Sequence, residues 1–274
     1  MKRAQIALGG TVAATLLIAG CSHDSGTTES SAGNIVLASY STTTKAQSAR
    51  ITETSTTEFP GAKHPLTQSL SGVVDFTTKT GELTSKLGPM VSTTRFVGGT
   101  AYQKLPGDLA QIYGAHTPWI TYRLDSVVGS SSQQQNAASS PLQALAALQG
   151  ATDKTEKVGT ETVDGTRTTH YRATIDLKRA VDKAGAFKDV MKAMLEDAKS
   201  TKVPCDLWLD EQGRVRKQST TTTMQVKDLD GKPATIHSTE TLMLTDFGTK
   251  VDVQAPPKDQ VTDVTAKMKE LRKN

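Results

Sequence analysis

The chain has 274 residues, of which 36% are hydrophobic and 4% aromatic, and it carries 32 basic and 28 acidic side chains. The charges are interspersed and form no basic stripe, which argues against a nucleic-acid partner. The low aromatic content and the abundance of threonine and serine favour a β-rich domain outside the cytoplasm over a helical bundle.

The first 20 residues predict an export signal. Lys2 and Arg3 form a basic head, and the apolar run after them is shorter than the roughly 20 apolar residues that a stable membrane span needs. The run ends in IAGC at residues 18–21, which is similar to a bacterial lipobox, where an aliphatic and two small residues precede a cysteine that receives diacylglycerol. We therefore predict that residues 1–20 are a lipoprotein signal peptide and that Cys21 is lipidated. The alternative is a plain secretory signal with an accidental cysteine.

The segment that begins at Cys21 predicts a flexible tether. Residues 21–34 are polar, with Ala32 as the one apolar residue beyond Cys21, and such a composition cannot bury enough apolar surface to fold. Acyl chains on Cys21 would anchor the exported chain to the outer face of the cell membrane, and two or three chains hold a protein firmly. We expect residues 35–274 to form a single domain.

The first half of that domain predicts short antiparallel strands. A weak helix is expected over residues 35–49. Alternating apolar residues between 51 and 124 then indicate half-buried strands, one of which places Val74 and Phe76 on the same face. The polar segment 129–141 predicts an exposed loop inside the domain.

A β-hairpin is predicted in the middle of the domain, after a short helix over residues 142–148. Asp164 and Gly165 form the turn signal. The second strand of the hairpin directs Tyr171 and Ile175 to its inner face.

Residues 203–209 predict another strand, with Cys205, Leu207 and Leu209 on one face. A buried thiol that acts as a small hydrophobe explains Cys205, because a nucleophilic cysteine requires an electropositive setting and the adjacent Asp206 provides the opposite.

The clearest helix pattern covers residues 187–198. Val190, Met191, Met194 and Leu195 fall on one face with polar residues between them. We expect this face to cover the concave side of the sheet, because a helix that joins two strands must bury its apolar stripe against a sheet. A second amphipathic helix is expected over residues 261–271.

A catalytic function finds little support. His170, Arg172 and Asp176 share the outer face of one predicted strand, and a histidine beside an aspartate can act as a base. However, no Gly-x-Ser-x-Gly motif is present, and a polar outer face is normal for a strand. The five histidines lack the spacing of a metal site. We expect no enzyme activity, no metal and no cofactor.

Several motifs in this order resemble the LppX/LprA/LprF/LprG group of actinobacterial lipoproteins, and more broadly the LolA-like fold. They are VGTETVDGTRTTHYRATIDL, a following helix, VPCDLWLDEQGRVRK and LTDFGTKVDVQAPP, and the resemblance covers roughly residues 35–264. It implies an α+β fold in which a strongly curved antiparallel sheet, a half-barrel, is wrapped over helices. It also implies an apolar cavity between sheet and helices that holds a lipid or glycolipid.

Two functions follow as hypotheses. The first is a non-catalytic envelope lipoprotein that binds or carries a lipid or lipidated molecule, and the second is a membrane-anchored interaction or sensor module with the same fold and no ligand. Inward-facing Thr220 and Thr222 would make one side of the cavity polar. The residues predicted to line the cavity are Val74, Phe76, Tyr171, Ile175, Val190, Met191, Met194, Leu195, Leu207 and Leu209.

Overall fold

The computed structural model describes residues 25–106, 109–123, 141–152, 154–185, 188, 191, 192, 195, 200–227 and 233–271. Its elements are α1 (Ser25–Thr44), β1 (Ser48–Glu58), β2 (Leu66–Asp75), β3 (Thr80–Leu87), β4 (Met90–Val97), β5 (Thr100–Lys104), α2 (Leu109–Ile112), β6 (Trp119–Arg123), α4 (Pro141–Ala147), η2 (Leu148–Gly150), β7 (Glu156–Val163), β8 (Thr166–Asp176), α5 (Leu177–Lys183), β9 (Lys202–Leu209), β10 (Val215–Lys227), β11 (Pro233–Thr245), η4 (Lys258–Gln260), β12 (Val261–Asp263) and α7 (Thr265–Leu271). Within these ranges, no helix has both the length and the apolar content of a membrane span.

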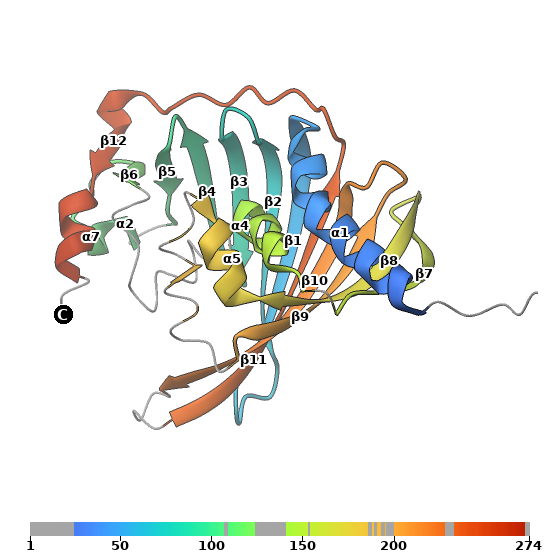
Figure 1. Ribbon diagram of the computed structural model, residues 1–274. Coiled ribbons are helices and arrows are strands. Elements are labelled where there is room, and N and C mark those ends of the chain that lie inside the picture. The colour runs from blue at the N-terminus through green and yellow to red at the C-terminus, as the bar shows by residue number, and fades with distance from the viewer. Residues whose placement is uncertain are drawn as a thin grey trace, which may run out of the picture.

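The strands form one curled, open sheet of 12 strands in the order β12-β6-β5-β4-β3-β2-β1-β11-β10-β9-β8-β7. Neighbouring strands are antiparallel except β12 and β6, which are parallel. The sheet bends around α1, α4 and α5 (Figure 1). The predicted fold class, a strongly curved antiparallel sheet over helices, is confirmed.

The predicted hairpin turn joins β7 and β8. Asp164 and Gly165 both adopt positive φ angles, 47° and 72°, as a two-residue type I′ turn requires. β7 also contains a bulge near its start, because the register with β8 shifts between Lys157 and Gly159 and leaves Val158 unpaired in the ladder. β7 is the last strand of the sheet on this side.

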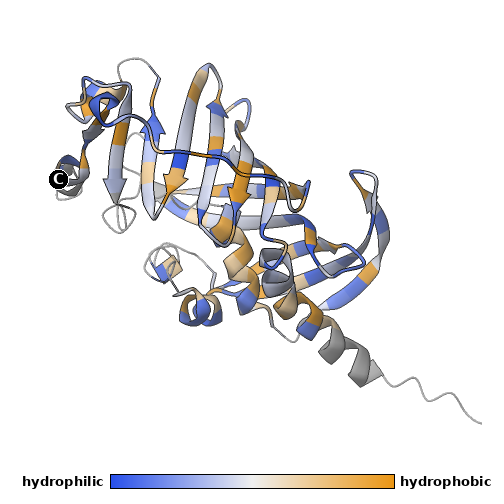
Figure 2. Ribbon diagram, turned by 90° about the horizontal axis from the view of Figure 1, so that it is seen from above, coloured by the Kyte–Doolittle hydropathy of each residue, from blue (hydrophilic) through white to orange (hydrophobic). Residues whose placement is uncertain are grey.

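One hydrophobic core fills the space between the sheet and the helices. Ile51 of β1, Leu207 of β9 and Leu244 of β11 meet Val36 of α1 and Leu145 of α4, and all five are fully buried. Figure 2 views the molecule from above and shows hydrophobic segments on these helices and on the strands that curve around them. A smaller cluster around Ile120 and Val264 joins β6 to the C-terminal end of the chain.

Helix α1 differs from the sequence expectation at both ends. It starts at Ser25, inside the predicted tether, and ends at Thr44. Ala32 is part of the core, and Ser39 and Thr43 are buried on the same helical face. Both hydroxyls are hydrogen-bonded, since Ser39 Oγ donates to the Val36 carbonyl at 2.7 Å and Thr43 Oγ1 accepts from the Val215 amide at 2.9 Å. Because two of the buried positions of α1 are Ser39 and Thr43, the spacing of apolar residues alone predicts this helix only weakly.

Helix α5 follows β8 directly. Leu177 opens the helix, because Asp176 caps it by accepting from the amides of Lys178 and Arg179. The predicted C-terminal helix starts later than expected. Val261 belongs to β12, which pairs with β6, and α7 begins at Thr265. The predicted loop 129–141 lies outside the described residues up to position 140.

Candidate ligand-binding face

The predicted cavity residues that the structure describes gather on the concave side of the sheet. Val74, Tyr171, Ile175, Met191, Leu207 and Leu209 are buried in the main core, and Phe76 and Leu195 pack against it. Val190, Met194 and Cys21, the residue predicted to be lipidated, lie outside the described residues. The structure therefore brings the described residues together, and their contact with a lipid stays a prediction.

The concave face becomes more polar along β1, β11 and β10. Side chains of directly paired residues point to the same face of a sheet. Glu53 pairs with Leu242, Ser55 with Glu240, and Glu240 in turn with Thr220. Glu53 alternates with the core residue Ile51, so all of them face inward. Thr220 therefore faces inward, and so does Thr222, two residues further along β10. This is the arrangement that makes one side of the predicted cavity polar.

Two glutamates on this face carry no counter-charge from the described residues. Glu53 is only 4% exposed. Burial raises its pKa from 4.5 to about 8, and the nearby Glu240 carboxyl adds to the shift. Burial raises the pKa of Glu240 as well. In the part of the chain that the structure describes, neither carboxyl has an ion-pair or hydrogen-bond partner, and a buried acid in that state favours its neutral form.

Gln218 of β10 completes this group. It is 3% exposed and pairs with Leu242, so that Leu242 lies between Glu53 on one side and Gln218 on the other. Its amide nitrogen donates to the Ala144 carbonyl of α4 at 3.1 Å, while its buried Oε1 has no partner among the described residues. We call Glu53, Glu240 and Gln218 the acceptor cluster. Alternation in ITETS, residues 51–55, places Glu53 on the same strand face as Ile51. Acids are rarely buried on a core face, so this spacing alone does not identify Glu53 as part of a binding site.

An apolar strip lies beside the acceptor cluster. Glu53 pairs on its other side with Leu70 of β2. The same inward face continues past Gln68 and Ser85, whose side chains bond to each other at 2.8 Å, to Leu66, Leu87 and Met90 at the ends of β2, β3 and β4. Leu66 is 48% exposed and Met90 44% exposed, so this end of the concave face presents apolar surface to its surroundings. We call Leu66, Leu70, Leu87 and Met90 the apolar strip.

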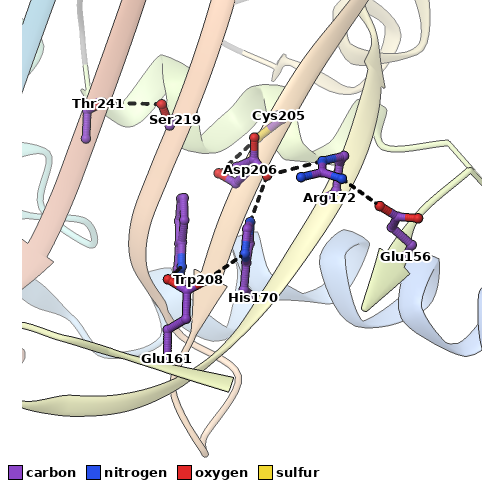
Figure 3. Close-up of polar contacts among 9 residues, drawn as sticks. All are labelled: Glu156, Glu161, His170, Arg172, Cys205, Asp206, Trp208, Ser219 and Thr241. Carbon is purple, nitrogen blue, oxygen red and sulfur yellow. Dashed lines mark hydrogen bonds and ion pairs between the residues drawn. The ribbon is translucent and has the colours of Figure 1, made fainter. Parts of the chain in front are cut away.

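A second polar group lies on the convex face and centres on His170 (Figure 3). His170 Nδ1 lies 2.9 Å from Glu161 Oε1, and Nε2 lies 2.7 Å from Asp206 Oδ1. Trp208 Nε1 donates to the other Glu161 oxygen at 2.9 Å. The hydrogen bond from Trp208 is the main reason that the pKa of Glu161 is lowered. This convex cluster of Glu161, His170, Asp206 and Trp208 links β7, β8 and β9.

The Ser219 hydroxyl lies beside the convex cluster, since Ser219 pairs with Asp206 in the ladder between β10 and β9, but its one hydrogen bond among the described residues joins it to Thr241 and not to His170. Ser219 Oγ and Thr241 Oγ1, drawn in the same view, are 3.3 Å apart and bond to each other. Cys205 points to the opposite face, where burial and then Asp206 raise its pKa to about 12. A neutral buried thiol is not a nucleophile, as predicted for Cys205. Asp176 is also absent from the cluster, because it caps α5 and pairs with Lys202.

A pocket of about 230 Å³ lies at the β7–β8 end of the sheet. Of the predicted cavity residues it touches only Leu209. Its walls are otherwise polar, which does not suit an acyl chain. The lining residues are Lys157, Thr160, Arg167, Thr168, Thr169, Leu209 and Glu211.

No family model and no curated protein sequence matches the chain. Solved structures similar to it include LprF from Mycobacterium bovis, with 14% identity, 82% of this chain and 97% of that chain covered, and a TM-score of 0.49. They also include the lipoprotein LppX from Mycobacterium tuberculosis, with 15% identity, coverage of 81% and 99%, and a TM-score of 0.44. A LolA superfamily protein from Nitrosomonas europaea has 10% identity, coverage of 83% and 96%, and a TM-score of 0.32. LprF and LppX belong to the group that the sequence motifs resemble.

Proposed function

We propose that this chain is a lipid-anchored protein of the cell envelope that binds or carries an acylated molecule on the concave face of its sheet, without catalysing a reaction. The observation that carries the proposal is the apolar strip. Large apolar side chains that are nearly half exposed on the concave face of a curled sheet offer a surface on which an alkyl chain gains free energy by losing water. The lipobox at residues 18–21 supports the anchor.

A second function, an interaction or sensor module without a ligand, is favoured by a different observation. The predicted cavity residues Ile175 and Leu207 are fully buried in the core, so that part of the space between sheet and helices is occupied by protein. Under this alternative, the apolar strip would contact a protein partner instead of an alkyl chain.

Lipid extraction tests the two functions directly. The full chain carrying Cys21→Ala has no anchor and can be purified from its host without detergent. A carrier is expected to retain acylated molecules that organic extraction and mass spectrometry reveal, or to take up a fluorescent fatty acid after delipidation. A protein that neither retains nor takes up any such molecule would be the module of the second function.

A further inference from the structure

We infer that the acceptor cluster binds the positively charged ammonium group of an amphiphile whose alkyl chain lies on the apolar strip. The inference rests on the proposed function, because it specifies the chemistry of the ligand at the same face. It concerns the head of the ligand and not its tail.

The first argument is the arrangement of the two surfaces. Glu53 pairs directly with Leu70 in the ladder between β1 and β2, and directly paired side chains lie about 4.5–5.5 Å apart at Cβ. The polar and the apolar surface therefore adjoin within one strand spacing. A ligand with a compact polar head and an alkyl tail contacts both.

The second argument is the donor and acceptor inventory. The Gln218 amide nitrogen already donates to Ala144, and only its Oε1 remains free. Ionised carboxyl groups at Glu53 and Glu240 accept hydrogen bonds and donate none. The inward neighbours Leu70, Leu242 and Thr220 bring no charge. Once ionised, the two carboxylates and Gln218 Oε1 offer acceptors only, and an ammonium group brings three donors with no acceptor.

The third argument is charge. The buried carboxyl group of Glu53 and the half-buried one of Glu240, next to each other and without a cation, favour their neutral forms, and an anionic head would add repulsion once either ionises. An ammonium group placed between them would favour ionisation, and charge-assisted hydrogen bonds are about twice as strong as neutral ones. Binding then replaces a proton by the ligand: a carboxyl O–H bond breaks, the proton passes to the solvent, and the carboxylate accepts from the ammonium.

Titration calorimetry with three amphiphiles tests the inference. Dodecylammonium, dodecyl maltoside and dodecyl sulfate share one alkyl chain and differ in the head. Each is added, below its micellar concentration, to the full chain carrying Cys21→Ala at neutral pH. We expect dodecylammonium to bind at least about tenfold more tightly than the maltoside. Its binding heat should differ between buffers of different ionisation enthalpy, because a proton is released.

The variants Glu53→Gln and Glu240→Gln separate the head from the tail. Each should reduce dodecylammonium binding towards that of the maltoside, abolish or diminish proton release, and leave maltoside binding unchanged. Glu58→Gln makes the same substitution on the opposite face of β1, since Glu58 pairs with His237 there, and should change nothing. Folding of each variant is checked by its thermal transition.

The outcomes distinguish this inference from the proposed function. Equal binding of the ammonium and maltoside amphiphiles, or an ammonium preference that survives in both glutamine variants, overturns the inference and leaves the carrier function in place. Failure of all three amphiphiles to bind overturns the carrier function itself.

Discussion

His170 and Trp208 stack ring on ring on the convex face, with centroids 4.3 Å apart and ring planes inclined by 12°. The Lys217 ammonium lies 4.2 Å from the centroid of the Trp208 ring. Because His170 is on β8, Trp208 on β9 and Lys217 on β10, this arrangement joins three neighbouring strands across their outer face.

The first prediction concerns the stability that His170 provides. His170 is 7% exposed and contacts two carboxyl groups. His170→Ala removes both hydrogen bonds and the stacking, and we expect the free energy of unfolding to fall by about 1–3 kcal/mol. Thr221→Ala, on the same face of β10 but exposed, should cost less than about 0.5 kcal/mol. Urea denaturation measures both, and equal effects would contradict a specific role for His170.

The second prediction concerns Glu161 at low pH. A carboxyl group whose pKa is lower in the folded state stabilises the fold above its unfolded pKa, and this contribution is lost as the pH falls through the folded value. Trp208→Phe keeps an aromatic ring against His170 but removes the N–H that bonds Glu161. We expect the pKa of Glu161 to move towards its ordinary value, as followed by carboxyl-carbon NMR. The acid-side decline in stability should become smaller.

The third prediction concerns Glu53 and has the opposite sign. Its pKa is raised from 4.5 to about 8 in the folded state, so the folded protein binds more protons than the unfolded chain between these values, and stability falls as pH rises through that window. Between pH 4.5 and neutrality this amounts to on the order of 3 kcal/mol. Glu53→Gln should flatten the pH profile of the unfolding free energy, whereas Glu58→Gln should leave it unchanged. If the unfolding free energy of Glu53→Gln still falls as pH rises through this window, a different titrating group causes the fall.

The fourth prediction compares two neighbouring residues on β4. Met90 is 44% exposed and faces the concave side, whereas Val91 is 45% exposed and faces the convex side. Under the proposed function, Met90→Glu should weaken fatty-acid uptake about tenfold or more, because it places a charge on the surface proposed to contact the alkyl chain. Val91→Glu should leave uptake unchanged. Both sites are exposed, so thermal melting should change little in either variant.

The fifth prediction concerns the anchor. Cys21→Ala should release the protein from the membrane fraction of its host while the melting temperature of the domain stays the same. The described helix starts at Ser25, four residues after Cys21, and a chain of four residues spans at most about 14 Å. Membrane association that persists in Cys21→Ala would show that another part of the chain holds it there.

The elements that sequence predicts well here are local. The hairpin at Asp164 and Gly165 and the buried face of β9 depend on turn chemistry and on alternation within one strand. The acceptor cluster depends on pairing between β1, β11 and β10, and β11 lies nearly 180 residues from β1 in the chain, so its register cannot be read from either strand alone. The partner of His170 depends on strand pairing in the same way. The sequence pattern places Asp176 on the same strand face as His170, but the pairing of β8 with β9 brings Asp206 to His170 instead.

The bulge at Val158 has a consequence for the outer edge of the sheet. Within the described residues, β7 has no strand on its far side, and such an edge exposes a row of N–H and C=O groups that another chain could pair with. The register shift divides β7 into Glu156–Lys157 and Gly159–Val163, and a bulge twists the strand and interrupts the row. An incoming strand therefore meets no continuous template along β7, and the charged Glu156 and Lys157 at its start oppose edge-to-edge association of neighbouring molecules.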